Sequence, residues 1–145
     1  MDAVVENLEE MLQKRNINPT SMRILVLKKL LKTEVALSLN DLDSQLDQAD
    51  RSTIFRTLKT FEEHKLIHAI EDGTGAVKYA LCESNCLCTP EFAHAHFHCT
   101  ICQNTFCLRK VHLPEIVLPK NFEVEQSSIV LRGVCDHCTP KSRLQ

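Results

Sequence analysis

Histidines and cysteines are concentrated between His94 and Cys102, and this stretch limits the possible folds of the chain more than any other. Its residues read His-Ala-His-Phe-His-Cys-Thr-Ile-Cys. Cys99 and Cys102 form a Cys-x2-Cys pair, which commonly supplies half of a tetrahedral zinc site. A second such pair, Cys135 and Cys138, follows farther along the chain. Rather than two unrelated buried cysteine pairs, we expect one closed site of four thiolates, which is typical of structural zinc.

The three histidines of this stretch predict a second metal-binding group. His94, His96 and His98 alternate with other residues, so on a β-strand all three would project to one face. All eight cysteines fall within residues 82–138, interleaved with histidines. This clustering favours metal ligation in a reducing compartment over a secreted disulfide framework.

Composition excludes several classes of protein. The 145 residues are 43% hydrophobic and 25% charged, as in an ordinary globular protein, and no apolar run reaches the length of a membrane span. The first ten residues are acidic and have no apolar signal core, so we expect a cytoplasmic location. A net charge of −2 argues against a protein that coats nucleic acid, but it permits DNA binding by a local patch.

The first part of the chain has the pattern of a winged helix. Apolar residues at helical spacing predict four helices, at residues 4–14, 21–32, after Ser38, and at 51–64. Thr20 is a suitable N-cap for the second helix, and Ser38 with Asp41 forms a partial capping box for the third. Two short apolar strands, 66–70 and 76–81, then flank a glycine-containing loop and predict a β-hairpin. Helices followed by such a hairpin indicate the winged form of the helix-turn-helix.

The fourth helix has one apolar side and one side suited to DNA. Ile54, Leu58 and Phe61 share a face and predict burial, as do Ile24, Leu27, Leu30 and Leu31 on the second helix. The residues off this stripe are Arg51, Ser52, Phe55, Arg56 and Lys59. Arginine can bind guanine through two hydrogen bonds, and an aromatic ring can contact a thymine methyl group. A solvated helix face with Phe55 in a side pocket is the alternative interpretation.

The remainder predicts a hinge and a second domain. Residues 82–93 contain a proline and no periodicity, and we interpret them as a hinge between residues 1–81 and 94–145. The second domain should contain the histidine strand, a return strand near 105–108 and a third strand over 122–134.

The order of these motifs resembles the ferric uptake regulator superfamily of bacterial metalloregulators. The matching segments are Thr20-Ser-Met-Arg23, Ser52-Thr-Ile-Phe-Arg-Thr-Leu58, the His94–Cys102 stretch and Cys135-Asp-His-Cys138. The resemblance implies an α+β protein with an N-terminal winged-helix domain and a C-terminal dimerisation domain. It also implies a homodimer that represses promoters when its regulatory metal is bound. Candidate contacts to operator DNA are then Lys14, Arg15, Arg23, Arg51, Ser52, Thr53, Phe55, Arg56 and Lys59.

The resemblance also implies a regulatory site beside the structural zinc site. The chain is most similar to the zinc-sensing branch, and the ligands we expect are His68, Cys82, His94 and His96. One thiolate and three imidazoles suit zinc, whereas iron and peroxide sensors of the family use more carboxylates. Iron is the alternative metal for this site. Further potential ligands are Cys86, Cys88, His98 and Cys107.

Functions of other classes fit the residues less well. A thiol oxidoreductase would place its Cys-x2-Cys in a βαβ context, which neither pair has. A zinc hydrolase would need an open metal position and a suitably spaced glutamate, which the sequence does not offer. We therefore expect no enzyme, no small organic substrate and no membrane partner. A zinc-ribbon adaptor that binds no DNA is a further alternative.

Overall fold

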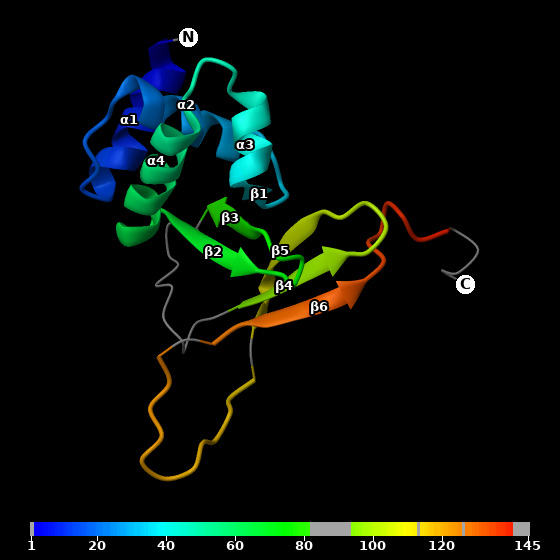
Figure 1. Cartoon of the computed structure of the whole chain (residues 1–145). Coiled ribbons are helices and arrows are strands. Elements are labelled where there is room, and N and C mark those ends of the chain that lie inside the picture. Colours follow the sequence, from blue (N-terminus) through cyan, green and yellow to red (C-terminus); the bar gives the residue numbers. More distant parts are fainter. Residues whose placement is uncertain (1, 82–93, 113, 126, 141–145) are drawn as a thin grey trace.

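The computed structural model describes residues 2–81, 94–112, 114–125 and 127–140, and it divides into two lobes (Figure 1). The N-terminal lobe, residues 2–81, contains the helices, and the C-terminal lobe contains the described residues from 94 onward. The hinge expected over 82–93 lies outside the described residues. The N-terminal lobe consists of α1 (Asp2–Lys14), α2 (Ser21–Leu31), β1 (Leu37–Ser38), α3 (Leu39–Gln45), α4 (Arg51–Glu63), β2 (Ile67–Glu71) and β3 (Val77–Leu81).

Local hydrogen bonds set the starts of two helices, as the sequence predicted. The Thr20 side chain accepts from the backbone N–H of Arg23 at 3.2 Å and caps α2. Ser38 and Asp41 form a reciprocal capping box at the start of α3, with bonds of 2.9 and 3.1 Å. These caps satisfy backbone donors that the first helical turn leaves without partners.

The hydrophobic core lies in the N-terminal lobe. Ile54, Leu58 and Phe61 on α4 are fully buried, which confirms the predicted inner face of this helix. They pack in one cluster with buried residues of α1, α2 and α3. The prediction for Leu31 is wrong, because this last residue of α2 is 46% exposed. Ile24 is only partly buried, and the buried residues of α2 are Val26, Leu27 and Leu30.

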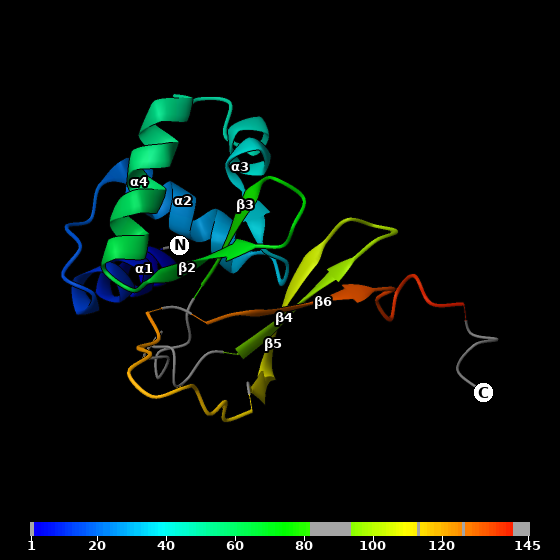
Figure 2. The same ribbon diagram turned by 60° about the horizontal axis from the view of Figure 1, so that its bottom comes forward.

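The winged helix-turn-helix is complete. Strands β2 and β3 pair as the predicted antiparallel hairpin, and β1, which was not predicted, adds a third strand beside β3. Gly73 and Gly75 in the turn have φ values of +87° and +89°, a conformation that glycine adopts without strain. In both views the hairpin lies between the helices and the C-terminal lobe (Figure 1 and Figure 2).

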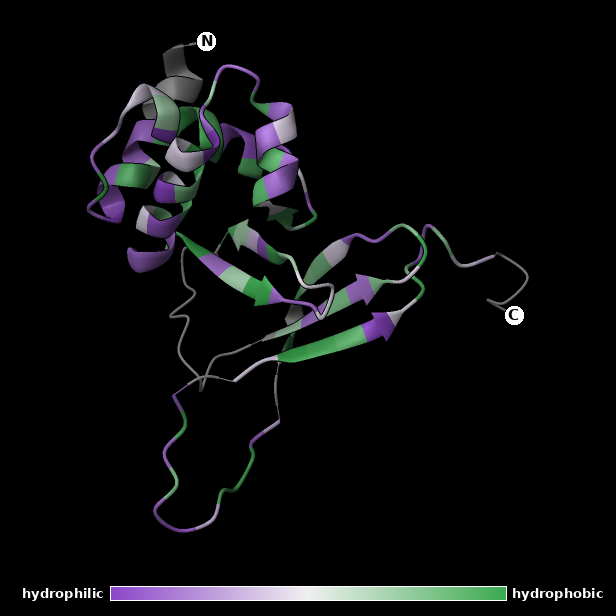
Figure 3. Cartoon of the chain, viewed as in Figure 1, coloured by the Kyte–Doolittle hydropathy of each residue, from purple (hydrophilic) through white to green (hydrophobic). Residues whose placement is uncertain are grey.

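The C-terminal lobe contains a second three-stranded sheet in the order β5-β4-β6. Its strands are β4 (His94–Cys99), β5 (Thr105–His112) and β6 (Ile129–Gly133), with β6 parallel to β4. The strand predicted over 122–134 is wrong at its start, because extended pairing begins only at Ile129. Many apolar residues before β6 face solvent (Figure 3), so a sheet this small has little apolar core of its own.

Candidate metal sites and nucleic-acid interface

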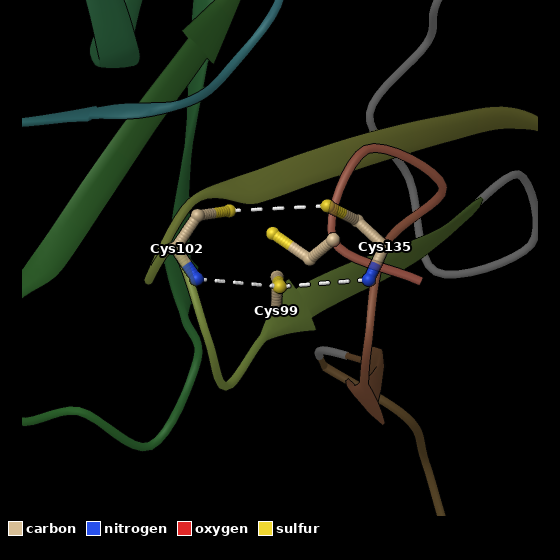
Figure 4. A group of neighbouring side chains, drawn as sticks. Cys99, Cys102 and Cys135 are labelled. Carbon is tan, nitrogen blue, oxygen red and sulfur yellow. Dashed lines mark hydrogen bonds between the residues drawn. The ribbon is translucent and has the colours of Figure 1, made fainter. Parts of the chain in front are cut away.

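The structure brings the two Cys-x2-Cys pairs together at one end of the C-terminal sheet. Cys99 ends β4, Cys102 lies in the turn after it, and Cys135 and Cys138 follow β6 (Figure 4). Because β6 is parallel to β4, both pairs leave the sheet at the same edge. The four sulfur atoms all lie within 4.8 Å of one another.

The spacing of these sulfur atoms fits a tetrahedral metal site. A Zn–S bond length of about 2.3 Å separates two sulfur ligands by about 3.8 Å in ideal tetrahedral geometry. The sulfur atoms of Cys102 and Cys135 are 3.9 Å apart. The residues present therefore suit zinc, which would have four thiolate ligands and no open position.

Backbone donors and neighbouring thiols shift the pKa values of Cys99 and Cys138 in opposite directions. The Cys99 sulfur accepts from the backbone N–H of Cys135 and of Cys102, each at 3.5 Å (Figure 4). The bond from Cys135, followed by that from Cys102, outweighs burial and lowers the pKa of Cys99 to about 6. The hydrogen bond with Cys135, together with burial, raises the pKa of Cys138 to about 12. Four thiolates this close require a compensating positive charge, which a divalent ion supplies.

A second cluster joins the two lobes. It contains His68 on β2, His96 on β4 and Cys107 on β5, whose ligand atoms lie within 4.8 Å of one another. The Nε2 atoms of His68 and His96 are 3.2 Å apart. Two imidazole ligands of a tetrahedral zinc ion, with Zn–N bonds of about 2.0–2.1 Å, lie about 3.3 Å apart. The geometry thus fits two nitrogen ligands and one sulfur ligand on a common ion.

Strand register explains why Cys107 belongs to this cluster. In the antiparallel pairing of β4 and β5, His96 lies opposite Cys107 and His98 lies opposite Thr105. Opposed residues project to the same face of a sheet. The sequence placed Cys107 only among further potential ligands. Counting outward from the tight turn that starts at Cys99 would have paired it with His96.

The other expected ligands have different placements. His98 lies on the same face as His96, but its Nδ1 atom is 3.0 Å from Thr105 Oγ1 and its Nε2 atom is 3.2 Å from Gln103 Oε1. Both ring nitrogens therefore have protein partners. The backbone of His94 begins β4, but its side chain lies outside the described residues. Cys82, Cys86 and Cys88 also lie outside the described residues.

The expected DNA-reading residues of α4 share an exposed face. Arg51, Ser52, Phe55, Arg56 and Lys59 are all exposed, opposite the buried stripe. Phe55 is 42% exposed, and the Lys59 ammonium lies 5.5 Å from the centre of its ring. Arg51 forms an ion pair with Asp43 at 3.3 Å, and Arg56 reaches Thr53 at 3.5 Å. The side-pocket interpretation of Phe55 does not fit this exposure.

The remaining candidate DNA contacts lie around the ends of α1 and α2. Arg23 donates to the carbonyl of Asn18 at 2.8 Å, which holds its guanidinium over the loop before α2. Lys14 is exposed at the end of α1. The Arg15 carbonyl lies 2.9 Å from Nδ1 of His64, so this end of α1 is beside the C-terminal end of α4. Arg51 begins α4 one helix length away, about 20 Å at 1.5 Å per residue.

A winged helix-turn-helix joined to a small lobe with two clusters of metal-binding side chains defines a class of metal-binding DNA-binding proteins. Residues 14–132 match the model of the ferric uptake regulator family. The chain belongs to this family. None of the helices in the described residues has the length and apolar character needed to cross a membrane.

Individual relatives are distant in sequence but similar along nearly the whole chain. The ferric uptake regulation protein of Campylobacter upsaliensis is 22% identical over 99% of this chain and 94% of its own length. A solved zinc uptake regulator in complex with zinc and DNA has a TM-score of 0.64 at 21% identity, over 94% of this chain and 93% of that one. The ferric uptake regulator of Vibrio cholerae has a TM-score of 0.61 at 16% identity, over 88% and 98%. At these identities the structures support the fold alone.

Proposed function

We propose that this chain is a zinc-dependent transcriptional repressor that binds operator DNA as a homodimer in the cytoplasm. Family membership supplies the class, a metal-dependent transcription regulator. The triad of His68, His96 and Cys107 carries the finer proposal, because its ligands come from both lobes. Because members of this class regulate transcription, we propose no enzymatic activity and no organic substrate for this chain.

The chemistry of the ligand atoms favours zinc at both sites. Four thiolates at Cys99, Cys102, Cys135 and Cys138 would bind a structural zinc ion that holds the C-terminal lobe together. The triad offers two imidazoles and a thiolate, a borderline-soft set that suits zinc better than ferrous iron or manganese. It contains no carboxylate. A fourth ligand would complete the tetrahedron, and His94 and Cys82 remain our candidates for that position.

Zinc at the triad would act by fixing the relative orientation of the lobes. His68 belongs to the N-terminal lobe, whereas His96 and Cys107 belong to the C-terminal lobe. An ion that requires all three favours the arrangement in which they meet, and it shifts the equilibrium by its preference for that state. A preference of about 1–3 kcal/mol would strengthen operator binding roughly 5–150-fold. In a dimer, lobe orientation sets the spacing of the two α4 helices.

The exposed face of α4 is the proposed reading surface. α3 and α4 form the helix-turn-helix, and the second helix of this motif enters the major groove in known complexes. Arg56 and Phe55 would contact base edges, whereas Lys14 and Arg15 would contact phosphates. Arg23, Arg51, Ser52, Thr53 and Lys59 complete the proposed interface.

Exposed apolar side chains support a dimer formed by the C-terminal lobe. Residues 114–125, here called the apolar loop, project from the sheet on the side away from the helices (Figure 1). Val117 is 90% exposed and Phe122 is 66% exposed, and Leu131 on β6 is 47% exposed. Side chains of this size on a small lobe mark an interaction surface. A second copy of the chain is the partner that we propose.

A zinc titration of operator binding tests the proposal. Operators would first be selected from a randomised duplex library with protein that carries both zinc ions. We expect two zinc ions per protomer, and tight binding of the selected duplex that a chelator reverses while the four-cysteine zinc remains. Tightening by ferrous iron but not by zinc would assign the chain to iron sensing. Equal affinity with and without the second metal would contradict metal-dependent repression.

A further inference from the structure

A buried carboxylate in the wing contacts the C-terminal lobe. The side chain of Asp72, in the turn between β2 and β3, is fully buried. Its Oδ2 atom accepts from the Lys78 ammonium at 2.8 Å and from the Thr105 hydroxyl at 2.6 Å. Lys78 belongs to the wing and Thr105 to β5, so this single oxygen joins residues of both lobes.

Further contacts surround this carboxylate and cross the same boundary. Lys78 also donates to the Thr105 hydroxyl and to the backbone carbonyl of Gln103, each at 3.1 Å. Arg132 on β6 donates to the backbone carbonyl of Asp72 at 2.8 Å. His98 Nδ1 lies 3.5 Å from Asp72 Oδ2. Each strand of the C-terminal sheet therefore contributes a contact to the wing, and the turn after β4 contributes another.

Because the Asp72 carboxylate is buried, the docked arrangement depends on its ion pair and hydrogen bonds. A carboxylate removed from water is stable only when its charge is paired and its oxygens are hydrogen-bonded. Burial opposes ionisation of Asp72, but hydrogen bonds from Lys78, Thr105 and Thr74 outweigh it and hold its pKa well below the usual range. Separation of the lobes would remove Thr105 from the pair and admit water.

We propose that Asp72 and its partners form a latch that, without any metal, raises the population of the arrangement in which the wing is docked on the C-terminal sheet, and so positions the regulatory ligands. This inference rests on the proposed regulatory site. On that sheet, Thr105 is two residues from Cys107 and His98 is two residues from His96, all on one face. Two residues along a strand span about 6.7 Å, so the latch lies directly beside the triad. Asp72 is a positioning residue and does not contact the ion.

The latch should strengthen metal binding because it brings the ligands together before the ion binds. A metal ion that must first bring two mobile lobes together binds more weakly, because part of its binding free energy is used to order the lobes. With the latch closed, His68 already faces His96 and Cys107 before the ion arrives. Loss of the latch should therefore weaken metal binding at the triad and leave the four-cysteine site unchanged.

Two matched pairs of variants distinguish loss of the latch from nonspecific destabilisation of the wing. Asp72→Asn removes the buried charge, and Glu71→Gln removes an exposed carboxylate from the adjacent residue. Gly73→Ala and Gly75→Ala impose similar backbone strain, because both glycines have positive φ. Only at Gly73 would the added methyl group overlap the Arg132 guanidinium, whereas nothing lies within 4 Å of its position at Gly75. The second pair tests the latch even if Asp72→Asn does not fold.

Hydrogen–deuterium exchange of residues 67–81 tests the docking in protein loaded only with the four-cysteine zinc. We expect faster wing exchange in Asp72→Asn and Gly73→Ala than in Glu71→Gln and Gly75→Ala. Equal exchange within each pair would overturn the latch. This measurement does not need the second metal, so its outcome is independent of the proposed regulatory site.

Competition with a zinc chelator then tests the positioning role in the same proteins. We expect the second zinc to bind at least about fivefold more weakly to Asp72→Asn and Gly73→Ala than to their controls. Unchanged affinity would overturn the positioning role while the wild-type protein still binds two ions. A wild-type protein that binds only one zinc would instead overturn the proposed regulatory site, and the positioning role with it.

Discussion

His68 and His96 face each other across the boundary between the lobes, with their Nε2 atoms 3.2 Å apart although the two residues are 28 positions apart in the chain. The two imidazoles come from different sheets, β2 in the wing and β4 in the C-terminal lobe. Cys107, opposite His96 on β5, completes the triad. An ion held there would report on the relative position of the lobes, which a site within one lobe could not do.

Cys107→Ala should weaken the second zinc by about tenfold or more, because a thiolate is the strongest of the three proposed ligands for zinc. Zinc at the four-cysteine site should remain. His137→Ala, which removes an exposed imidazole, is the control. Zinc content and chelator competition measure both effects. If Cys107→Ala binds two ions as tightly as the wild type, the third ligand is a different residue.

Cys102→Ser should release the structural zinc and unfold the C-terminal lobe, since metal binding there contributes folding free energy. The N-terminal lobe should keep its helices, because the main hydrophobic cluster lies within residues 8–79. Limited proteolysis combined with circular dichroism distinguishes the two lobes. Global unfolding, or a C-terminal lobe that stays resistant without zinc, would contradict a division into structural and regulatory sites.

Arg56→Ala should cost roughly 1–3 kcal/mol of discrimination between the operator and a scrambled duplex, because a bidentate arginine reads a base edge. Lys28→Ala removes an exposed positive charge from the last turn of α2, which is outside the proposed interface, and should leave discrimination intact. Fluorescence anisotropy with both duplexes gives the two affinities. Equal losses on the two duplexes would make Arg56 a phosphate contact.

Lys14→Ala should weaken binding to every duplex similarly, because phosphate contacts do not carry sequence information. The plot of the logarithm of the binding constant against the logarithm of the salt concentration should become less steep by about 1. Titrations at several salt concentrations, with the operator and the scrambled duplex, measure this slope. A change confined to the operator would mean that the end of α1 takes part in reading the sequence.

Val117→Asp should weaken self-association by about tenfold or more, because a charge would replace one of the most exposed apolar side chains of the apolar loop. Its 90% exposure within one chain means that folding of the monomer should not suffer. Sedimentation over a range of concentrations measures the dimer, and Glu115→Gln in the same loop is the control. An unchanged dimer would exclude this loop from the interface.

Patterns that act over a few residues were readable from the sequence. The spacing of Ile54, Leu58 and Phe61 predicted the buried face of α4, and Ser38 with Asp41 predicted the cap of α3. In each case the structure depends on the period of a helix or on hydrogen bonds between near neighbours. Where the pattern was weaker, as before Ile129, the predicted strand began several residues too early.

By itself, the sequence determined the two Cys-x2-Cys pairs, the order of helices and hairpin, and the exposed face of α4, because spacing along the chain controls those features. Only the tertiary structure decided that Cys107 meets His68 and His96, and that Asp72 is buried against Thr105. Both outcomes depend on strand register and on the docking of one sheet against another. These are set by the packing of segments far apart in the chain, which no local pattern specifies.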